Sequence, residues 1–248
     1  MTNWNGIKIR CSALGSLLTQ PQSKAAKDAG ELSETTKSYL VSVYIEHKYG
    51  RKKDIQSKYL EKGKLAEEDS IDLLSKYEKE FLQKNEDWLQ NDYISGTPDI
   101  FRGETIHTAT EIIDIKTSWN LETFLSNVAK PLNPHYIAQL NGYMALSGAN
   151  TAWICYCLTS APNSLVEDEK RKLLYRMNVV SDESPEYKLA ALELENDMIF
   201  EDISINERIL KFRVDRDDEM IENIYQKVRK AREFLADFEL KHINFNTK

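Results

Sequence analysis

The stretch Glu111–Ser118, with the sequence EIIDIKTS, constrains the fold more than any other part of this chain. Its β-branched apolar residues predict a strand. Residues two apart in a strand point to the same face, so Asp114 and Lys116 lie side by side while Ile113 and Ile115 form an apolar face. A charged pair beside a core is costly unless it is paired or holds a metal ion. This strand therefore predicts a chemical site.

The acid-x-Lys spacing alone is weak evidence for chemistry. The same spacing occurs at Glu46/Lys48, Asp168/Lys170, Glu186/Lys188 and Glu239/Lys241. A solvated helix face explains those four pairs. Only Asp114 and Lys116 alternate with apolar residues in a predicted strand, so we expect the site there.

A second acid follows a proline in Gly96-Thr97-Pro98-Asp99, on a neighbouring strand predicted over residues 93–101. Alone, a Pro-Asp pair is more often a turn than a metal ligand. Two strands that each supply a carboxylate can, however, meet at one divalent cation, which prefers oxygen ligands. We therefore expect Asp99 and Asp114 to share one site.

The rest of the chain alternates predicted helices and strands. Ser33 and Asn133-Pro134 are helix-start signals, and Gly50 and Gly148 are stop signals. The other expected elements are an extended segment and helix over 7–18, a mobile loop over 20–30, helices over 59–84, 167–177, 185–198 and after Asp217, and strands over 151–158 and 209–214. No repeat or linker divides the chain, so we expect one α/β domain over residues 1–248, with a central mixed β-sheet flanked by helices.

Composition excludes several classes of protein. The 248 residues are 41% hydrophobic and 29% charged, with a net charge of −7, which argues weakly against a protein that coats nucleic acid. The sequence shows no apolar run of the roughly 20 residues that a membrane span needs, nor a signal-peptide pattern, so we expect a cytoplasmic location. The cysteines Cys11, Cys155 and Cys157 suggest neither disulfides nor a zinc or iron–sulfur site, and we expect buried thiols.

The pattern Pro98-Asp99 … Asp114-Ile115-Lys116 resembles the PD-(D/E)xK nuclease superfamily. Its flanks resemble the phage branch, the group of lambda exonuclease and YqaJ-type viral recombinases. Further matching segments are residues 63–70 (GKLAEEDS), a helical element with an acid four residues after a glycine; 117–118, small polar residues; 135–143 (HYIAQLNGY), the helix with a glutamine and an aromatic; and 10–15 (RCSALG), the segment that meets the DNA end. The resemblance runs, with gaps, over about residues 7–158.

The resemblance implies a restriction-endonuclease-like core and a metal site. Asp99 and Asp114, with the Ile115 carbonyl, would bind Mg²⁺, for which Mn²⁺ would substitute. Glu67 would complete the site or hold a second metal ion, with Glu68 as the alternative. The acid of the acid-x-Lys element is Asp114 here, whereas lambda exonuclease has a glutamate.

The resemblance also implies roles for residues around the metal. Lys116 would position the attacking water and help to deprotonate it, and Gln139 would orient this water or the scissile phosphate. Expected DNA contacts are Arg10, Ser12, Ser118 and Tyr143. The serine that grips a 5′-phosphate would match Ser12, but its partner arginine falls near Asn5, which leaves Arg10 as a substitute.

The implied activity is exonuclease hydrolysis of linear double-stranded DNA, 5′-to-3′, in phage-type recombination in a bacterial host. A single-strand annealing protein and a homotrimer are the expected partners. The alternatives are an endonuclease of the same fold and a catalytically inactive DNA-binding or assembly protein. The basic run Lys227, Arg229, Lys230 and Arg232 is expected on the solvent side of the last helix.

Overall fold

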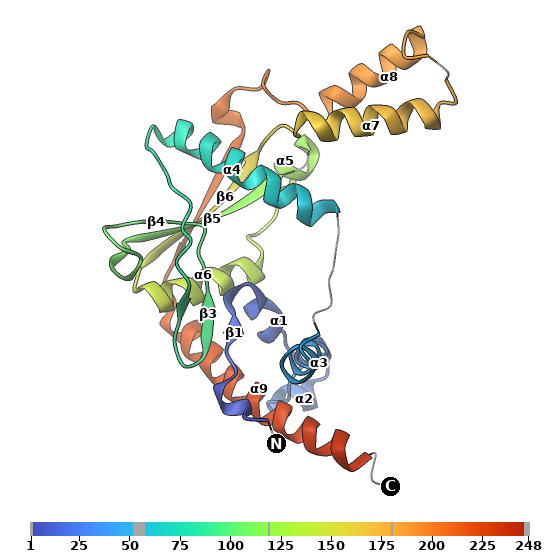
Figure 1. Ribbon diagram of the computed structural model, residues 1–248. Coiled ribbons are helices and arrows are strands. Elements are labelled where there is room, and N and C mark those ends of the chain that lie inside the picture. The colour runs from blue at the N-terminus through green and yellow to red at the C-terminus, as the bar shows by residue number, and fades with distance from the viewer. Residues whose placement is uncertain (1, 52–57, 119, 180, 246–248) are drawn as a thin grey trace.

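The computed structural model describes residues 2–51, 58–118, 120–179 and 181–245, and only the backbone is described for residues 58–66. Within these residues the strands form two sheets (Figure 1). The larger has the order β4-β5-β6-β7, made of β4 Ile100–Arg102, β5 Glu111–Ser118, β6 Thr151–Leu158 and β7 Ile209–Asp215. Since β5 and β6 are parallel and the outer pairs are antiparallel, the prediction of a mixed sheet is confirmed. The single domain stays a prediction.

The smaller sheet has the order β1-β3-β2, made of β1 Ile9–Arg10, β2 Leu89–Gln90 and β3 Ile94–Gly96. The prediction of one strand over residues 93–101 is wrong, because this segment divides into β3 and β4 in different sheets. Pro98 lies between them, and a proline has no N–H with which to continue a ladder. Asp99 therefore lies where the chain passes from one sheet to the other.

The helices are α1 Leu14–Leu17, α2 Lys24–Asp28, α3 Glu34–Tyr49, α4 Lys58–Glu78, α5 Leu121–Ala129, α6 Pro134–Ser147, α7 Asn163–Arg176, α8 Pro185–Asn196 and α9 Asp218–Phe245. The expected caps are confirmed: Ser33 accepts from the Thr36 amide, and Gly50 and Gly148 adopt the left-handed conformation with φ 64° and 84°. None of the helices in the described ranges is long and apolar enough to cross a membrane.

Two helix predictions need correction. Residues 24–28 of the expected loop form α2, because the Ser23 side chain accepts from the Ala26 amide at the helix start. The helix expected over residues 59–84 ends at Glu78, and Lys79 follows in the left-handed region with φ 57°. The chain therefore leaves α4 at this point and runs without regular structure to β2, at the edge of the smaller sheet.

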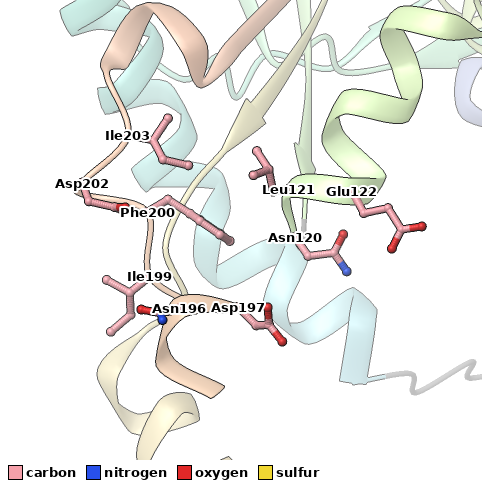
Figure 2. A pocket seen from close by; sticks show the side chains of 9 residues that line it. All are labelled: Asn120, Leu121, Glu122, Asn196, Asp197, Ile199, Phe200, Asp202 and Ile203. Atoms are coloured by element: carbon pink, nitrogen blue, oxygen red, sulfur yellow. The ribbon is translucent and has the colours of Figure 1, made fainter. Parts of the chain in front are cut away.

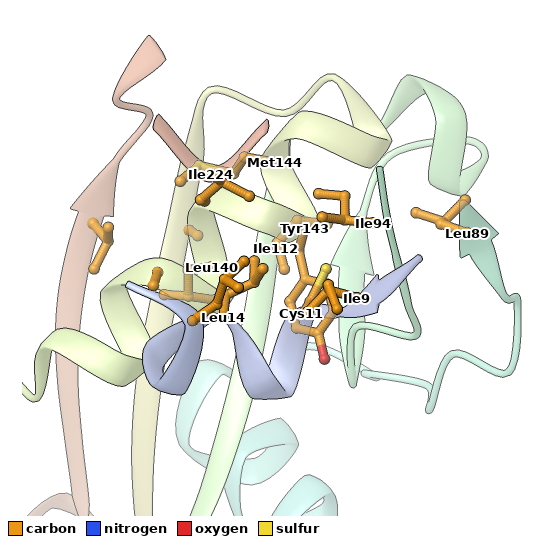
Figure 3. Packing of buried hydrophobic residues seen from close by; sticks show 14 of the residues in the cluster. Ile9, Cys11, Leu14, Leu89, Ile94, Ile112, Leu140, Tyr143, Met144 and Ile224 are labelled. Carbon is orange, nitrogen blue, oxygen red and sulfur yellow. The ribbon is translucent and has the colours of Figure 1, made fainter. Parts of the chain in front are cut away.

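Helices cover both faces of β5. Ile113 and Ile115 are buried in one cluster with Leu74 of α4. Ile112 is buried in the other cluster with Leu140 of α6, which Figure 3 shows beside the N-terminal segment. Burial of each such side chain stabilises the fold by about 1.5–3 kcal/mol. The predicted apolar face of the strand is confirmed, and the face carrying the acid is covered as well.

The N-terminal segment lies directly against α6 (Figure 3). A Cβ at Gly142 would lie 2.6 Å from Leu14 Cδ1 and 2.9 Å from Cys11 Sγ, so a larger residue there would force these buried side chains to shift. Cys11 is buried, as are Cys155 and Cys157, and burial raises the pKa of all three thiols. The prediction of buried thiols is confirmed.

The prediction that the basic run of α9 faces solvent is wrong in part. Lys227 is buried, and Arg232 donates from both Nε and a terminal nitrogen to the Ile7 carbonyl, at 3.0 and 2.9 Å. Lys230 donates to the Gly30 carbonyl at 3.0 Å. These contacts tie α9 to the N-terminal region, which no periodicity within α9 could reveal.

Candidate active site

The site begins at the edge of β5 that β4 leaves. β4 pairs with β5 only as far as Ile100 opposite Ile113. Beyond this point the Ile115 amide donates instead to Asp99 Oδ2 at 2.7 Å. Because the N–H and C=O of one strand residue point to the same side, the Ile115 carbonyl faces this edge too. The Asp99 carboxylate and the Ile115 carbonyl therefore lie together.

Asp114 lies on the face of β5 that α6 covers, with 1% of its surface exposed. Its Oδ1 accepts a hydrogen bond from Gln139 Nε2 at 2.9 Å. Its buried Oδ2 lies 2.6 Å from Lys116 Nζ, so the two side chains form a close ion pair. These two contacts leave part of the acceptor capacity of Asp114 unused.

Gln139 is held in one orientation by its neighbours. A carboxylate only accepts, so the amide nitrogen must face Asp114. The same Nε2 also donates to the Tyr143 hydroxyl at 3.1 Å. This leaves Oε1 of Gln139 as an acceptor, which is the group needed to orient a water molecule.

Lys116 is a cation held between a carboxylate and an aromatic ring. Its Nζ lies 4.7 Å from the ring centroid of Tyr136, and 23% of its side chain is exposed. Burial lowers the pKa of Lys116, but the charge of Asp114 and the contact with its carboxylate, together with the charge of Asp99, outweigh burial and raise the pKa above the ordinary value. Lys116 is therefore protonated in the metal-free protein.

The positive charge near Asp99 and Asp114 is too small to offset the effect of burial on their carboxyl groups. Burial, and then the charge of Asp114, raise the pKa of Asp99 from 3.8 to about 7. Burial also raises the pKa of Asp114, with Lys116 opposing the shift and Glu67 adding to it. Two neighbouring acids whose pKa values are both raised by burial are a typical arrangement for a cation site.

Helix α4 brings Glu67 toward these acids. Ser70 is fully buried, and its Oγ lies 2.8 Å from Thr117 Oγ1 on β5. One turn earlier, Glu67 has 26% of its side chain exposed and pairs with Lys84 at 3.0 Å, while Glu68 is exposed. The preference for Glu67 over Glu68 stays a prediction. The Gly63 end of the expected face lies where only the backbone is described.

The predicted DNA contacts divide into two groups. Arg10 and Ser12 are exposed, next to the helix that carries Gln139. Ser118 and Tyr143 are each only 4% exposed, and the Tyr143 hydroxyl supports Gln139. All four contacts with DNA stay predictions. Ser118 and Tyr143 are too buried in this structure to offer DNA more than a small part of their surface.

Sequence reasoning missed Asn85, which lies just past the end of α4. The buried Asn85 donates from its amide to the Asp99 carbonyl at 2.7 Å and from Nδ2 to the Pro98 carbonyl at 3.0 Å. These bonds fix the backbone of the Pro-Asp pair. An asparagine after a helical period is a turn signal, but nothing local indicates its partner.

The fit of these residues to a metal ion follows from their donor atoms. Among the described residues there is no group of three or more histidine, cysteine, aspartate or glutamate side chains that could hold a metal. The arrangement instead offers the Ile115 carbonyl and the two carboxylates of Asp99 and Asp114, the second with its Oδ2 buried beside Lys116. This set fits Mg²⁺, which usually keeps several waters and binds through one or two protein carboxylates.

Figure 2 shows a separate pocket between the start of α5 and the segment after α8. The residues that line it are Asn120, Leu121, Glu122, Asn196, Asp197, Ile199, Phe200, Asp202 and Ile203. None of these is a predicted site residue, so the pocket is not part of the candidate active site.

No protein-family model matches this sequence, and no curated protein matches it either. Among solved structures, the chain is similar to a phage related exonuclease from Haemophilus somnus 129PT, with 27% identity and a TM-score of 0.72 over 96% of this chain and 97% of that one. It also has the fold of an alkaline exonuclease from Laribacter hongkongensis, with 14% identity and a TM-score of 0.61 over 98% and 96% of the two chains. A structure of that exonuclease with dAMP aligns with a TM-score of 0.60 and 17% identity, over 99% of this chain and 96% of that one. The predicted resemblance to the phage branch is confirmed.

Proposed function

We propose that this chain, which has the fold of the phage exonucleases of the PD-(D/E)xK superfamily, is a Mg²⁺-dependent deoxyribonuclease. It would hydrolyse phosphodiester bonds from the ends of linear double-stranded DNA. The observation that carries the proposal is that Asp99, at the open edge of β5, lies near Asp114 on its face, where burial raises the pKa of both acids and the charge of Asp114 adds to the shift of Asp99.

Asp99, Asp114 and the Ile115 carbonyl would hold the metal ion, and Glu67 would complete the site or hold a second ion. When bound, such an ion lowers the pKa of a water molecule and neutralises charge that builds on the phosphate. Asn85 supports this role because it fixes the backbone on which Asp99 depends.

Lys116 and Gln139 would act on the attacking water. Asp114 holds the proton on Lys116, so the ammonium can donate to the water or to the phosphate oxygens. Its participation as a base would require that a bound cation offset the charge of Asp114. Gln139 would accept from the water through Oε1, because Asp114 and Tyr143 occupy its amide nitrogen.

The finer parts of the proposal concern the DNA end. Arg10 and Ser12 would contact a 5′-phosphate, giving 5′-to-3′ cleavage. The trimer, the annealing partner and the recombination role follow from the resemblance alone. An endonuclease of this fold remains the second candidate, and cleavage of covalently closed circles would favour it.

A gel assay on linear and covalently closed circular DNA tests the proposal. We expect cleavage of linear duplex with Mg²⁺ or Mn²⁺, none in EDTA, and a preference between 5′-phosphate and 5′-hydroxyl ends. Asp114→Ala and Lys116→Ala should each abolish cleavage, without additive losses, because both serve one unit. Lys170→Ala is the matched control, since this half-buried lysine also pairs with carboxylates, those of Glu167 and Glu195, but lies on α7 away from the candidate site. Undiminished cleavage in EDTA would refute the metal mechanism.

A further inference from the structure

We propose that the ring of Trp88 is a stacking platform for a DNA base beside the active site, with Arg10 holding the adjoining phosphate. This inference rests on the proposed function and extends it to a residue that the sequence patterns did not single out. Three observations carry it: the position of Trp88 relative to Asp99, the exposure of its ring, and its contact with Arg10.

The backbone places Trp88 next to the site. In the antiparallel register of β2 and β3, Leu89 lies opposite Gly96, so the preceding Trp88 lies opposite Thr97, two residues before Asp99. On its other side, the Asp87 amide donates to Asn85 Oδ1 at 3.2 Å, and the Asn85 amide donates to the Asp99 carbonyl. Trp88 therefore lies between two neighbours, Leu89 and Asp87, whose backbone contacts lead to the segment of Asp99, the acid proposed to bind the metal ion.

The ring of Trp88 is available to a partner. Trp88 is 51% exposed, while the adjacent Leu89 is 3% exposed and holds the strand in the core. A single exposed aromatic side chain is common and needs no explanation by itself. Here the ring lies directly before the paired strand β2 and beside Arg10, so stacking on it would order few additional groups.

Arg10 supplies the charge that a nucleic acid needs. The Arg10 guanidinium lies 5.6 Å from the centroid of the Trp88 ring, and Arg10 is exposed on β1 opposite Ser95. An aromatic face next to an arginine is the usual combination for single-stranded nucleic acid, with the base on the ring and the backbone along the cation.

The surrounding charges indicate how the strand would lie. Glu86 and Asp87 precede Trp88 and are exposed, so they would repel a phosphate on their side. Lys8 lies on the opposite side, two residues before Arg10, and donates to Gln90 of β2 at 2.9 Å. The phosphate backbone would therefore run along Lys8 and Arg10, and the base would turn inward onto Trp88.

The test is DNA binding measured by fluorescence anisotropy in EDTA, where the proposed nuclease cannot cleave, using labelled duplexes with and without a single-stranded end. We expect Trp88→Ala to bind about tenfold more weakly, since stacking contributes roughly 1–3 kcal/mol per base. Trp88→Phe, which keeps a ring, should stay within about threefold of wild type. Arg10→Gln should lower the slope of log affinity against log salt by about one, whereas Trp88→Ala should leave the slope unchanged.

Tyr175→Ala is the matched control, because Tyr175 is an 80% exposed aromatic residue on α7. It should bind DNA as the wild type does. Equal binding by Trp88→Ala and wild type would overturn the proposal, as would a Trp88→Phe variant as weak as Trp88→Ala. If the wild type cleaves DNA with Mg²⁺ but either result is found, only the stacking inference fails. If the wild type neither cleaves nor binds DNA, the proposed function fails with it.

Discussion

Replacing Asp99 with asparagine should stabilise the metal-free protein at alkaline pH while it abolishes cleavage. Burial and the charge of Asp114 raise the pKa of Asp99 from 3.8 to about 7. The folded protein thus binds this proton more tightly than the unfolded chain. The resulting contribution to stability is fully present below pH 3.8 and is lost as the pH rises through about 7.

The magnitude follows from these two pKa values. Proton linkage gives a loss of at most about 3 kcal/mol between pH 5 and pH 8, which solvent screening of the partly exposed Asp99 reduces. Asparagine carries no charge and can still accept the hydrogen bond from the Ile115 amide. Asp99→Asn should therefore already exceed the wild type in free energy of unfolding at pH 5, where the unfolded chain has begun to lose this proton, and its advantage should grow by at most about 3 kcal/mol at pH 8.

The measurement is urea unfolding in EDTA at both pH values. Asp182→Asn is the control, because Asp182 is an exposed aspartate between α7 and α8. Mg²⁺ at pH 8 should stabilise the wild type more than Asp99→Asn, since the ion relieves the same repulsion. A variant no more stable than wild type at pH 8, or one with the same gain at both pH values, would refute the reasoning.

Three further predictions concern the residues around the acids. Glu67→Gln should severely slow cleavage and weaken Mn²⁺ binding, whereas the exposed Glu68→Gln should stay near wild type in a metal titration of activity; the reverse result would mean that α4 is rotated. Gln139→Leu should lower kcat by about 10- to 100-fold, because a hydrogen bond to the Asp114 carboxylate is lost. Tyr143→Phe should lower kcat by only about 5-fold, because the hydroxyl only supports Gln139. Equal losses for the two variants in steady-state assays would contradict this supporting role. Lys84→Met should tighten Mn²⁺ binding several-fold, because the Lys84 ammonium, 3.0 Å from Glu67, competes with the metal ion for this carboxylate. The measurement is calorimetry without DNA, and an unchanged Mn²⁺ affinity would exclude such competition.

The sequence by itself determined the features that depend on a few neighbouring residues. The alternation in Glu111–Ser118 predicted both the strand and its apolar face. Ser33, Gly50 and Gly148 marked helix ends that the structure shows, because caps satisfy backbone groups within one turn. The family resemblance selected the acids and the glutamine, and the structure brings Asp114 and Gln139 into contact.

Only the tertiary structure decided how the site is assembled. The break at Pro98 moves the chain between two sheets, which leaves the edge of β5 open and turns Asp99 onto the Ile115 amide. Asn85 holds that Pro-Asp backbone, and Trp88 follows it in the same segment. A strand period or a helix cap is encoded within a few residues. Which edge remains unpaired, and which side chains reach it, depends on the packing of segments far apart in the chain, and no local pattern specifies that packing.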